Sequence, residues 1–336
     1  MKFVYVLTSS EKDIYLDQLY LSVSSLRAHS RDARVIVLVD SETMLGLNGY
    51  RADVTKIAEF QCVDVPDFYG KTERSRYIKT TIRKHVDGDF LFIDTDTVVC
   101  RELVAPDCEL GMVYDANTRI VSPQLHEGRK RDARICGFRE PSLDNFNSGV
   151  IYARDTAVVH EFFNAWHENW KLSLARGVKR DQPALAEAQL DFPGLIKVLG
   201  NTWNLQVYKQ NKVLLKDVMA AKVMHFIVGF DAKKSGQHAR SELFDYGLWA
   251  RIKQNEGLTD EARRFIAAPG AGLRDAYLIA LGSEQDALMS TDTYHFIKTL
   301  HAKKKWIFSA VESFFSGIRV FYCWIKKFRK KDAGFA

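Results

Sequence analysis

The chain lacks the short motifs that assign many sequences of its size to a class. Its five cysteines, among 336 residues, are scattered and form no Cys-x-x-Cys pair or Cys/His cluster. Neither a disulfide framework nor a structural zinc site is indicated, and a reducing compartment is favoured. The Gly-x-Gly-x-x-Gly fingerprint is missing at Thr8-Ser9-Ser10-Glu11, after the first expected strand, which argues against NAD binding. The apolar run at the start is too short for a signal peptide.

The net positive charge of the chain is confined to its last 34 residues. The net charge is +6, but residues 303–336 alone hold nine Lys or Arg and two acidic residues. The remaining residues therefore carry a net charge of −1. A basic groove across the main body is not supported, so we do not expect a nucleic-acid partner.

Strand and helix patterns alternate in the first half. Apolar runs predict strands at residues 3–8, 35–40, 61–65, 110–114 and 146–152, and a further strand that begins at residue 90. Helical spacing of apolar residues predicts helices at 13–29, 72–85 and 156–174. This rhythm predicts an α/β fold with a doubly wound, mostly parallel sheet.

Two regions do not follow this rhythm. Residues 115–145 are polar, rich in arginine and without an evident element, so we expect a functional or disordered loop, one that could close over an acceptor and face anionic groups on it. Residues 241–302 look helical, with a break at Pro269-Gly270-Ala271-Gly272. We therefore expect a main domain at 1–240, a helical extension at 241–302 and a tail at 303–336.

The tail has an amphipathic helical pattern. Its apolar residues recur at alternating spacings of four and three: Ile307, Val311, Phe314, Ile318, Phe321, Ile325 and Phe328. Lysine clusters flank this stripe, while Glu312 and Arg319 within it argue against a membrane span. We expect residues 303–331 to lie on an anionic membrane surface. The alternative is a stripe that packs on its own domain or pairs with a second copy.

The most informative stretch is Phe90-Leu91-Phe92-Ile93-Asp94-Thr95-Asp96. A fully apolar strand ends there in two carboxylates, and side chains at i and i+2 of an extended segment point the same way. Ligands of open α/β sheets bind at the carboxyl ends of strands. Asp94 and Asp96 are therefore candidate ligands of Mg²⁺ or Mn²⁺ beside a phosphorylated molecule. The alternative is a solvated turn, as we expect for Asp87-Gly88-Asp89.

Five motifs, each common by itself, occur in one order along residues 1–230. They are Ser75-Arg76-Tyr77, Asp94-Thr95-Asp96, Asn147-Ser148-Gly149, Asp181-Gln182 and Met224-His225-Phe226. With these motifs the chain resembles glycosyltransferase family 8, retaining nucleotide-sugar transferases of the GT-A fold that include bacterial lipo-oligosaccharide galactosyltransferases and glycogenin. The resemblance implies a GT-A fold, a UDP-sugar donor and a bound Mn²⁺ or Mg²⁺. It does not extend beyond about residue 240.

The resemblance implies a third metal ligand and a cation near the donor. His225 would join Asp94 and Asp96, and an imidazole tilts the choice of ion toward Mn²⁺. Arg76 would add fixed positive charge near the donor. From the residues alone, a core or surface role for His225 and a solvated helix face for Arg76 remain open.

Further residues match family positions around the sugar. Asn147 and Asp181 would hydrogen-bond sugar hydroxyls, and Gln182 would lie beneath the anomeric carbon. The alternative for Asp181-Gln182 is a helix cap. Trp203-Asn204 resembles another family pair, although Trp203 also suits a hydrophobic core.

Contacts with the nucleotide are expected from the start of the chain and from a late lysine. Thr8, Tyr15 and Thr95 would contact UDP, with Tyr15 stacked on uracil. The family places a lysine on the diphosphate shortly after the histidine, and Lys233 or Lys234 would take that place here, without the usual Lys-Pro-Trp sequence. The acidic residues that the family carries after the first strand are serines in this chain.

The expected activity is metal-dependent, retaining transfer of a hexose, galactose or glucose, from a UDP-sugar to a hydroxyl of a glycan or lipid-linked acceptor. The basic tail suggests work at the cytoplasmic face of a bacterial membrane, in lipopolysaccharide or other surface-polysaccharide synthesis. One alternative is a sugar-1-phosphate nucleotidyltransferase, which normally carries a glycine-rich, basic loop after its first strand. An inverting transferase and a non-catalytic, membrane-docked scaffold that binds a sugar nucleotide are the others.

Overall fold

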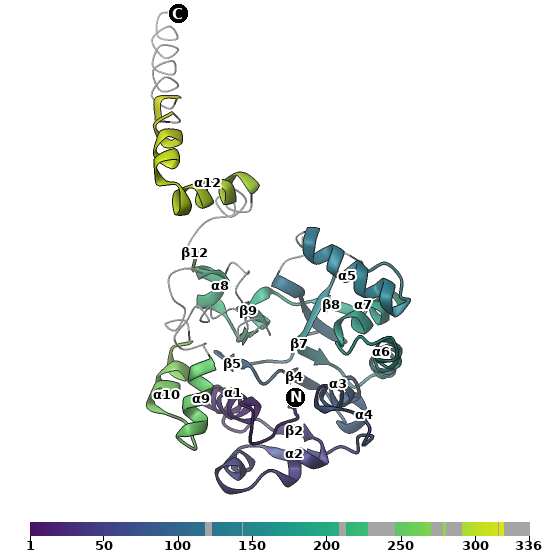
Figure 1. The fold of residues 1–336 in the computed structure, drawn as a ribbon. Helices are drawn as coiled ribbons and strands as arrows, with labels where there is room; N and C mark the ends of the chain where they lie inside the picture. The colour runs from purple at the N-terminus through teal and green to yellow at the C-terminus, as the bar shows by residue number, and fades with distance from the viewer. Residues whose placement is uncertain are drawn as a thin grey trace, which may run out of the picture. The chain divides into compact units, whose positions relative to one another are not determined.

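The computed structural model (Figure 1) describes residues 1–117, 123–142, 144–207, 213–227, 246–269, 278–279, 291–314 and 316–318. The chain divides into two compact units, Met1–Leu278 and Ile279–Ala336. The boundaries expected at residues 240 and 302 stay predictions.

The first unit is built on a seven-stranded sheet in the order β3-β2-β1-β4-β7-β6-β8. Its strands are β1 (Lys2–Leu7), β2 (Val35–Val39), β3 (Glu59–Cys62), β4 (Phe90–Ile93), β6 (Leu110–Tyr114), β7 (Phe146–Ala153) and β8 (Ile196–Val198). All run parallel except β7, which is antiparallel to both of its neighbours, β4 and β6. The predicted mostly parallel sheet is confirmed.

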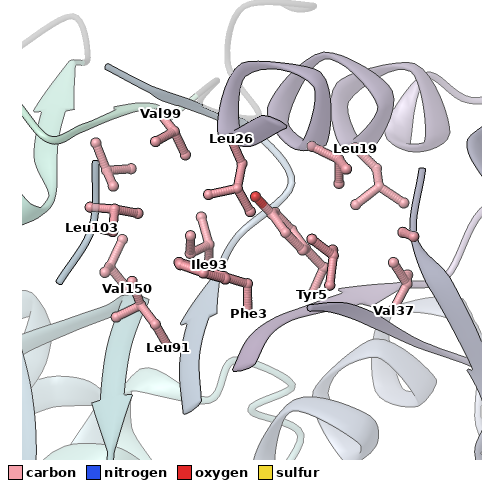
Figure 2. Close-up of a cluster of buried hydrophobic side chains, with 14 of the residues drawn as sticks. Phe3, Tyr5, Leu19, Leu26, Val37, Leu91, Ile93, Val99, Leu103 and Val150 are labelled. Atoms are coloured by element: carbon pink, nitrogen blue, oxygen red, sulfur yellow. The ribbon is translucent and has the colours of Figure 1, made fainter. Parts of the chain in front are cut away.

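Helices cover both faces of this sheet, as a doubly wound fold requires. They are α1 (Tyr15–His29), α2 (Ser41–Leu45), α3 (Lys71–Thr80), α4 (Ile82–His85), α5 (Pro123–Cys136), α6 (Ala157–Ala175) and α7 (Gln182–Asp191). On one face Leu19 and Leu26 of α1 pack over Tyr5 of β1 (Figure 2). On the other face the large side chains of α6 belong to one core with residues of β1, β2 and β4, and the Phe163 ring of α6 lies edge-on to Phe90 of β4. Alternate residues of each buried strand therefore feed two separate cores.

A second, three-stranded sheet supplies residues that face the end of β4. It has the order β5-β11-β9 and comprises β5 (Thr97–Val99), β11 (Val223–Phe226) and β9 (Leu205–Val207). The 3-10 turn η3 (Asn201–Trp203) precedes β9, and α8 (Leu215–Ala220) follows the short strand β10 (Val213–Leu214). Helices α9 (Tyr246–Gln254) and α10 (Asp260–Ala267) pack on α1 and β11 through a third hydrophobic core that includes Phe226, Trp249 and Phe265.

One expectation about local structure is wrong. Residues 115–145 do contain an element, helix α5, preceded by the turn η2 (Asp115–Asn117). Of the described α5 side chains, only Asp132, Ala133 and Cys136 are buried, so the helix lacks the broad apolar stripe by which helices are recognised in a sequence. The strand expected from Phe90 is confirmed, since β4 ends at Ile93, directly before the two acids, and β5 begins at Thr97.

Other expected elements are present with shifted ends. The helix expected at 72–85 is divided at Thr81 into α3 and α4. The Asp87-Gly88-Asp89 turn forms as expected, with Gly88 at a φ of +70°, a conformation that suits glycine. A further 3-10 segment, η1 (Gly49–Lys56), lies between α2 and β3.

The second unit is helical where it is described. A two-residue strand, β12 (Leu278–Ile279), lies at the boundary, and α12 (Asp292–Lys303) begins after Thr291, whose hydroxyl accepts a hydrogen bond from the backbone N–H of Tyr294. The backbone leaves helical geometry at Lys304 and is helical again over 305–314 and 316–318. Within the described ranges, no helix combines the length and apolarity needed to cross a bilayer.

Candidate active site

The two acids after β4 lie in a short turn that connects the two sheets. The backbone N–H of Asp94 donates to the carbonyl of Gly149 on β7 at 2.8 Å. The hydroxyl of Thr97 donates to the carbonyl of Asp94, also at 2.8 Å, and thereby closes the turn. The two carboxylates therefore converge through a fixed turn and not, as the spacing suggested, through an extended strand.

His225 reaches this turn from the second sheet. Strand β11 pairs His225 with Thr97 of β5, and the N–H of Phe226 donates to the carbonyl of Asp96 at 2.8 Å. The Nε2 atom of His225 lies 3.1 Å from Oδ1 of Asp96 and 4.0 Å from Oδ2 of Asp94. One donor atom from each of the three side chains lies within 4.8 Å of the others. The predicted triad thus comes together, with His225 contributed by the second sheet.

Glycine at position 149 makes this approach possible. A Cβ atom on Gly149 would lie 2.2 Å from Cε1 of His225 and 2.6 Å from its Nδ1, far inside van der Waals contact. The glycine of the Asn-x-Gly motif therefore has a steric role. Asn147 faces the same side of β7 as Gly149, while Ser148 faces the opposite side, as the alternation of a strand requires.

The charges of the triad shift one another. Burial would raise the pKa of Asp96, but the adjacent His225 imidazole outweighs burial and holds that pKa below its ordinary value. Burial would likewise lower the pKa of His225, and the two aspartates, Asp96 foremost, raise it instead. Two carboxylates and an imidazole that share so small a space favour an added positive charge.

A second charged cluster adjoins the triad. The Nζ atom of Lys79, whose side chain is 3% exposed, lies 3.1 Å from Oδ1 of Asp94 and 3.8 Å from Oδ2 of Asp181. Arg76, one turn earlier on α3, places Nε 3.2 Å from the other oxygen of Asp181. Asp181 raises the pKa of Arg76. Lys79 therefore connects Asp181 to Asp94, and Arg76 adds a second positive charge beside Asp181.

Asp181 occupies the N-cap position of α7, but its side chain does not cap the helix, which was the alternative that the sequence left open. Instead Oδ2 accepts a hydrogen bond from the hydroxyl of Ser148 at 2.9 Å. Burial would raise the pKa of Asp181, and Arg76, Lys79 and Ser148 together lower it, so the carboxylate is held in its charged form.

Gln182 begins α7 beside Asp181. Its Nε2 donates to the carbonyl of Phe146 at 2.8 Å, which fixes the orientation of the amide because a carbonyl can only accept. The Oε1 atom is buried and has no hydrogen-bond partner among the residues that the structure describes. An unpaired buried oxygen is costly, and such atoms are often completed by a ligand.

Asn147, expected to contact the sugar, is already engaged with its neighbours. Its Oδ1 accepts from the N–H of Gly149 and from Nδ2 of Asn204, each at 2.9 Å. Its Nδ2 donates to Oδ1 of Asp115 at 3.2 Å. A contact between Asn147 and a sugar hydroxyl stays a prediction.

The expected nucleotide contacts are distributed around the start of the chain. Thr8 is buried at the end of β1, Tyr15 is 43% exposed at the start of α1, and Thr95 is half-buried between the two acids. Lys71 places Nζ 5.1 Å from the centre of the Tyr15 ring. Lys233 and Lys234 lie outside the described residues, so the diphosphate contact stays a prediction.

Three residues of the site were missed by sequence reasoning. Lys79 is the clearest, although its spacing of three from Arg76 places both on one face of a helix and was an available signal. Asp115 was seen only as the edge of a polar segment, and Ser148 only as the variable residue of its motif. Trp203 is in the core of the first unit, whereas its neighbour Asn204 is fully buried beside His225.

Comparison with known proteins finds no matching family model and no matching curated protein. Solved structures of glycosyltransferases do match. Mouse xyloside xylosyltransferase 1 in its apo form has a TM-score of 0.44 and 13% identity, over 67% of this chain and 96% of that one. The galactosyltransferase LgtC with donor and acceptor sugar analogues has a TM-score of 0.46 and 14% identity, over 79% of this chain and 99% of that one. An active-site mutant of LgtC has a TM-score of 0.48 and 16% identity, over 85% of this chain and 99% of that one. Likenesses this distant carry no argument about substrate or mechanism, which must come from the residues of the site.

Proposed function

We propose that the chain is a metal-dependent, retaining glycosyltransferase that moves a hexose, galactose or glucose, from a UDP-sugar to a hydroxyl of an acceptor. The observation that carries the proposal is the convergence of Asp94, Asp96 and His225 within 4.8 Å at the end of β4. The cationic residues of α3 lie next to that triad, and Gln182, which follows Asp181, has an amide oxygen without a hydrogen-bond partner among the described residues. Few activities need all three of these features together.

The triad fits a divalent cation. Two carboxylates and one imidazole form a mixed oxygen and nitrogen donor set, which suits Mn²⁺ better than Mg²⁺. The missing side chain at Gly149 gives His225 room to present its ring to the acids. A cation bound there would supply Lewis-acid neutralisation of the charge that develops on a departing diphosphate.

The residues around the triad suit the handling of a sugar. Asp181, held ionised by Arg76 and Lys79, is able to accept hydrogen bonds from sugar hydroxyls, a contact that discriminates strongly between epimers. The free Oε1 of Gln182 would stabilise positive charge that builds at the anomeric carbon. An amide is a poor nucleophile, so Gln182 would act as a stabilising contact on the face of the sugar that reacts.

The proposal is tested by incubating the full chain with a panel of UDP-sugars and following slow donor hydrolysis with and without Mn²⁺. We expect hydrolysis of one or two UDP-hexoses that depends on Mn²⁺, and its loss in Asp96→Asn. The matched control is Asp87→Asn, since Asp87 belongs to the turn before β4 and not to the triad. Equal rates in the two variants, or hydrolysis without a divalent cation, would exclude the proposal.

Two further measurements separate the alternatives. NMR of the freshly released sugar distinguishes retention from inversion at the anomeric carbon. In thermal unfolding, UDP should raise the melting temperature only when Mn²⁺ is present. A non-catalytic scaffold predicts no donor hydrolysis, and a nucleotidyltransferase predicts release of a sugar-1-phosphate and UTP when pyrophosphate is added.

We further propose that the acceptor is a glycan or lipid-linked sugar presented at an anionic membrane surface. Residues 303–305 are three lysines, and the helical residues that follow expose Trp306, Phe314 and Ile318 at 74, 66 and 48%. Exposed aromatic and aliphatic groups next to lysines suit an anionic lipid interface. The full chain should float with anionic vesicles and not with neutral ones, whereas a chain that ends at Ala302 should not float. Equal behaviour of both chains would contradict this.

A further inference from the structure

We infer that a chain of hydrogen bonds from Asp115 through Asn147 and Asn204 fixes the tautomer of His225, so that its Nε2 lone pair faces Asp94 and Asp96. Asn204 is then a positioning residue, which acts on the metal through the histidine. The inference rests on the proposed function, since it concerns how the triad is prepared for a cation. It also answers a question that atom positions alone leave open, namely which ring nitrogen carries the proton.

The donor and acceptor roles in this series of hydrogen bonds are fixed first at Asn147. One side of its amide faces the backbone N–H of Gly149 at 2.9 Å, a group that can only donate. The other side faces Oδ1 of Asp115 at 3.2 Å, a group that, when ionised, can only accept. Asn147 must therefore turn its oxygen toward Gly149 and its nitrogen toward Asp115. A flipped amide would lose both hydrogen bonds.

The direction then passes to Asn204. Since the oxygen of Asn147 can only accept, the group of Asn204 that lies 2.9 Å from it must be the amide nitrogen. The oxygen of Asn204 is thereby turned toward Nδ1 of His225, at 3.0 Å. An amide oxygen accepts and does not donate, so Nδ1 of His225 must carry a hydrogen. In the neutral imidazole the free lone pair is then on Nε2, the atom that lies 3.1 Å from Asp96.

Because Asn204 and His225 are buried, their hydrogen bond determines the tautomer of the histidine. Asn204 has no exposed surface and His225 is 4% exposed, so water does not compete for these groups. A metal-bound histidine usually has its other nitrogen held by a hydrogen bond of this kind. Asp115 anchors the far end, because its second oxygen lies 2.7 Å from Nη2 of Arg129 on α5. Helix α5 therefore contributes to the orientation of a ligand that it does not touch.

The test exchanges the amide and the carboxylate in the hydrogen bond between Asn147 and Asp115. In Asn147→Asp the new carboxylate would face the carboxylate of Asp115, where an amide nitrogen now donates, and the link is broken by repulsion. In the double variant Asn147→Asp with Asp115→Asn an amide again faces a carboxylate, and residue 147 still accepts from Gly149 and Asn204. We expect the single variant to bind Mn²⁺ about 10- to 100-fold more weakly, and the double variant to recover most of the loss. Mn²⁺ affinity is measured by electron paramagnetic resonance of the free ion.

A direct readout observes the unsubstituted chain. ¹⁵N-histidine NMR of the full chain with Mg²⁺ should show the His225 ring protonated at Nδ1, with the signal assigned by its loss in His225→Gln. An Nδ1 without a hydrogen, or a double variant that binds no better than the single one, would overturn the inference while Mn²⁺-dependent hydrolysis still stands. If the unsubstituted chain binds neither Mn²⁺ nor Mg²⁺, the inference and the proposed function fall together.

Discussion

The ammonium group of Lys79 lies 3.1 Å from the carboxylate of Asp94, in a place where the lysine side chain is 3% exposed. Its Nζ atom lies over the Phe92 ring, 5.0 Å from the ring centre. The same ammonium is 3.8 Å from Asp181. One buried cation thus stabilises both an acid of the proposed metal triad and the acid proposed to contact the sugar.

Replacement of Lys79 by methionine should destabilise the fold markedly. The stem would still pack on Phe92, but Asp94 and Asp181 would lose a buried partner, and the loss of one member of a buried ion pair costs about 3 kcal/mol. Urea unfolding of both proteins without a divalent cation measures the change. The control is Lys56→Met, which removes an exposed lysine paired with Asp53 and should leave the midpoint unchanged. Equal midpoints for the two variants would refute the assignment.

Replacement of Gly149 by alanine should abolish tight Mn²⁺ binding. The added methyl group would overlap the ring of His225, so the histidine must move away from the acids or β7 must shift. We expect at least a tenfold loss of Mn²⁺ affinity, of the size seen when the support of a metal ligand is disturbed. The measurement is a Mn²⁺ titration followed by electron paramagnetic resonance.

The matched control for that change is Gly128→Ala. Gly128 lies within α5, and a Cβ atom there would have nothing within 4 Å. Alanine is favoured over glycine inside a helix by up to about 1 kcal/mol, so this variant should be slightly more stable and should bind Mn²⁺ normally. Weaker binding in Gly128→Ala would show that the effect at position 149 is not specific.

The sheet and the acid pair were predictable because their signals are local. Apolar runs of four to six residues, such as 35–39 and 90–93, identify buried strands, and an acid pair directly after one of them identifies a ligand edge. His225 was found through its place in an ordered set of motifs. Its own neighbours, Met224 and Phe226, would equally suit a core histidine.

The missing parts depend on distances that no local pattern encodes. Lys79 faces Asp94 only because of the angle at which α3 packs on the sheet. Asn204 meets Asn147 only because β7 and the residue before β9, which belong to different sheets, come together in the fold. Helix α5 was missed for a different reason. Its charged side chains make ion pairs outside the helix, Arg129 with Asp115 and Asp132 with Arg180, in place of an apolar stripe.

Replacement of Asp181 by asparagine should separate sugar handling from metal binding. Asp181 is not among the three grouped metal ligands, and an amide can still accept the hydrogen bond of Ser148. The charge that Arg76 and Lys79 face would be gone. We expect Mn²⁺ affinity to change little, while kcat/KM for donor hydrolysis falls about 100-fold, the size of one lost polar contact at a reacting centre. Parallel losses in affinity and turnover would instead place Asp181 in the metal site.

The pH dependence of stability should carry the signature of His167. This histidine on α6 is 5% exposed, and its Nδ1 lies 2.8 Å from the hydroxyl of Thr80. Burial lowers its pKa from the ordinary 6.5 to about 4. Between those values the unfolded chain takes up a proton that the folded protein excludes, so the free energy of unfolding decreases as the pH falls. The stability that depends on neutral His167 is fully present above pH 6.5 and is lost as the pH approaches 4.

Another buried group acts in the opposite direction and must be separated from His167. Burial raises the pKa of Asp17 to about 6, so the unfolded chain releases its proton first and Asp17 favours folding less as the pH rises toward 6. The unfolding free energy of His167→Gln is therefore subtracted from that of the unsubstituted chain. The contribution of Asp17 cancels in this difference, because Asp17 is present in both proteins. From pH 7 to pH 5 we expect that difference in unfolding free energy to fall by about 1 kcal/mol, with solvent screening taken into account. Urea unfolding at the two pH values measures it, and a difference that does not vary with pH would mean that His167 takes up its proton in the folded protein.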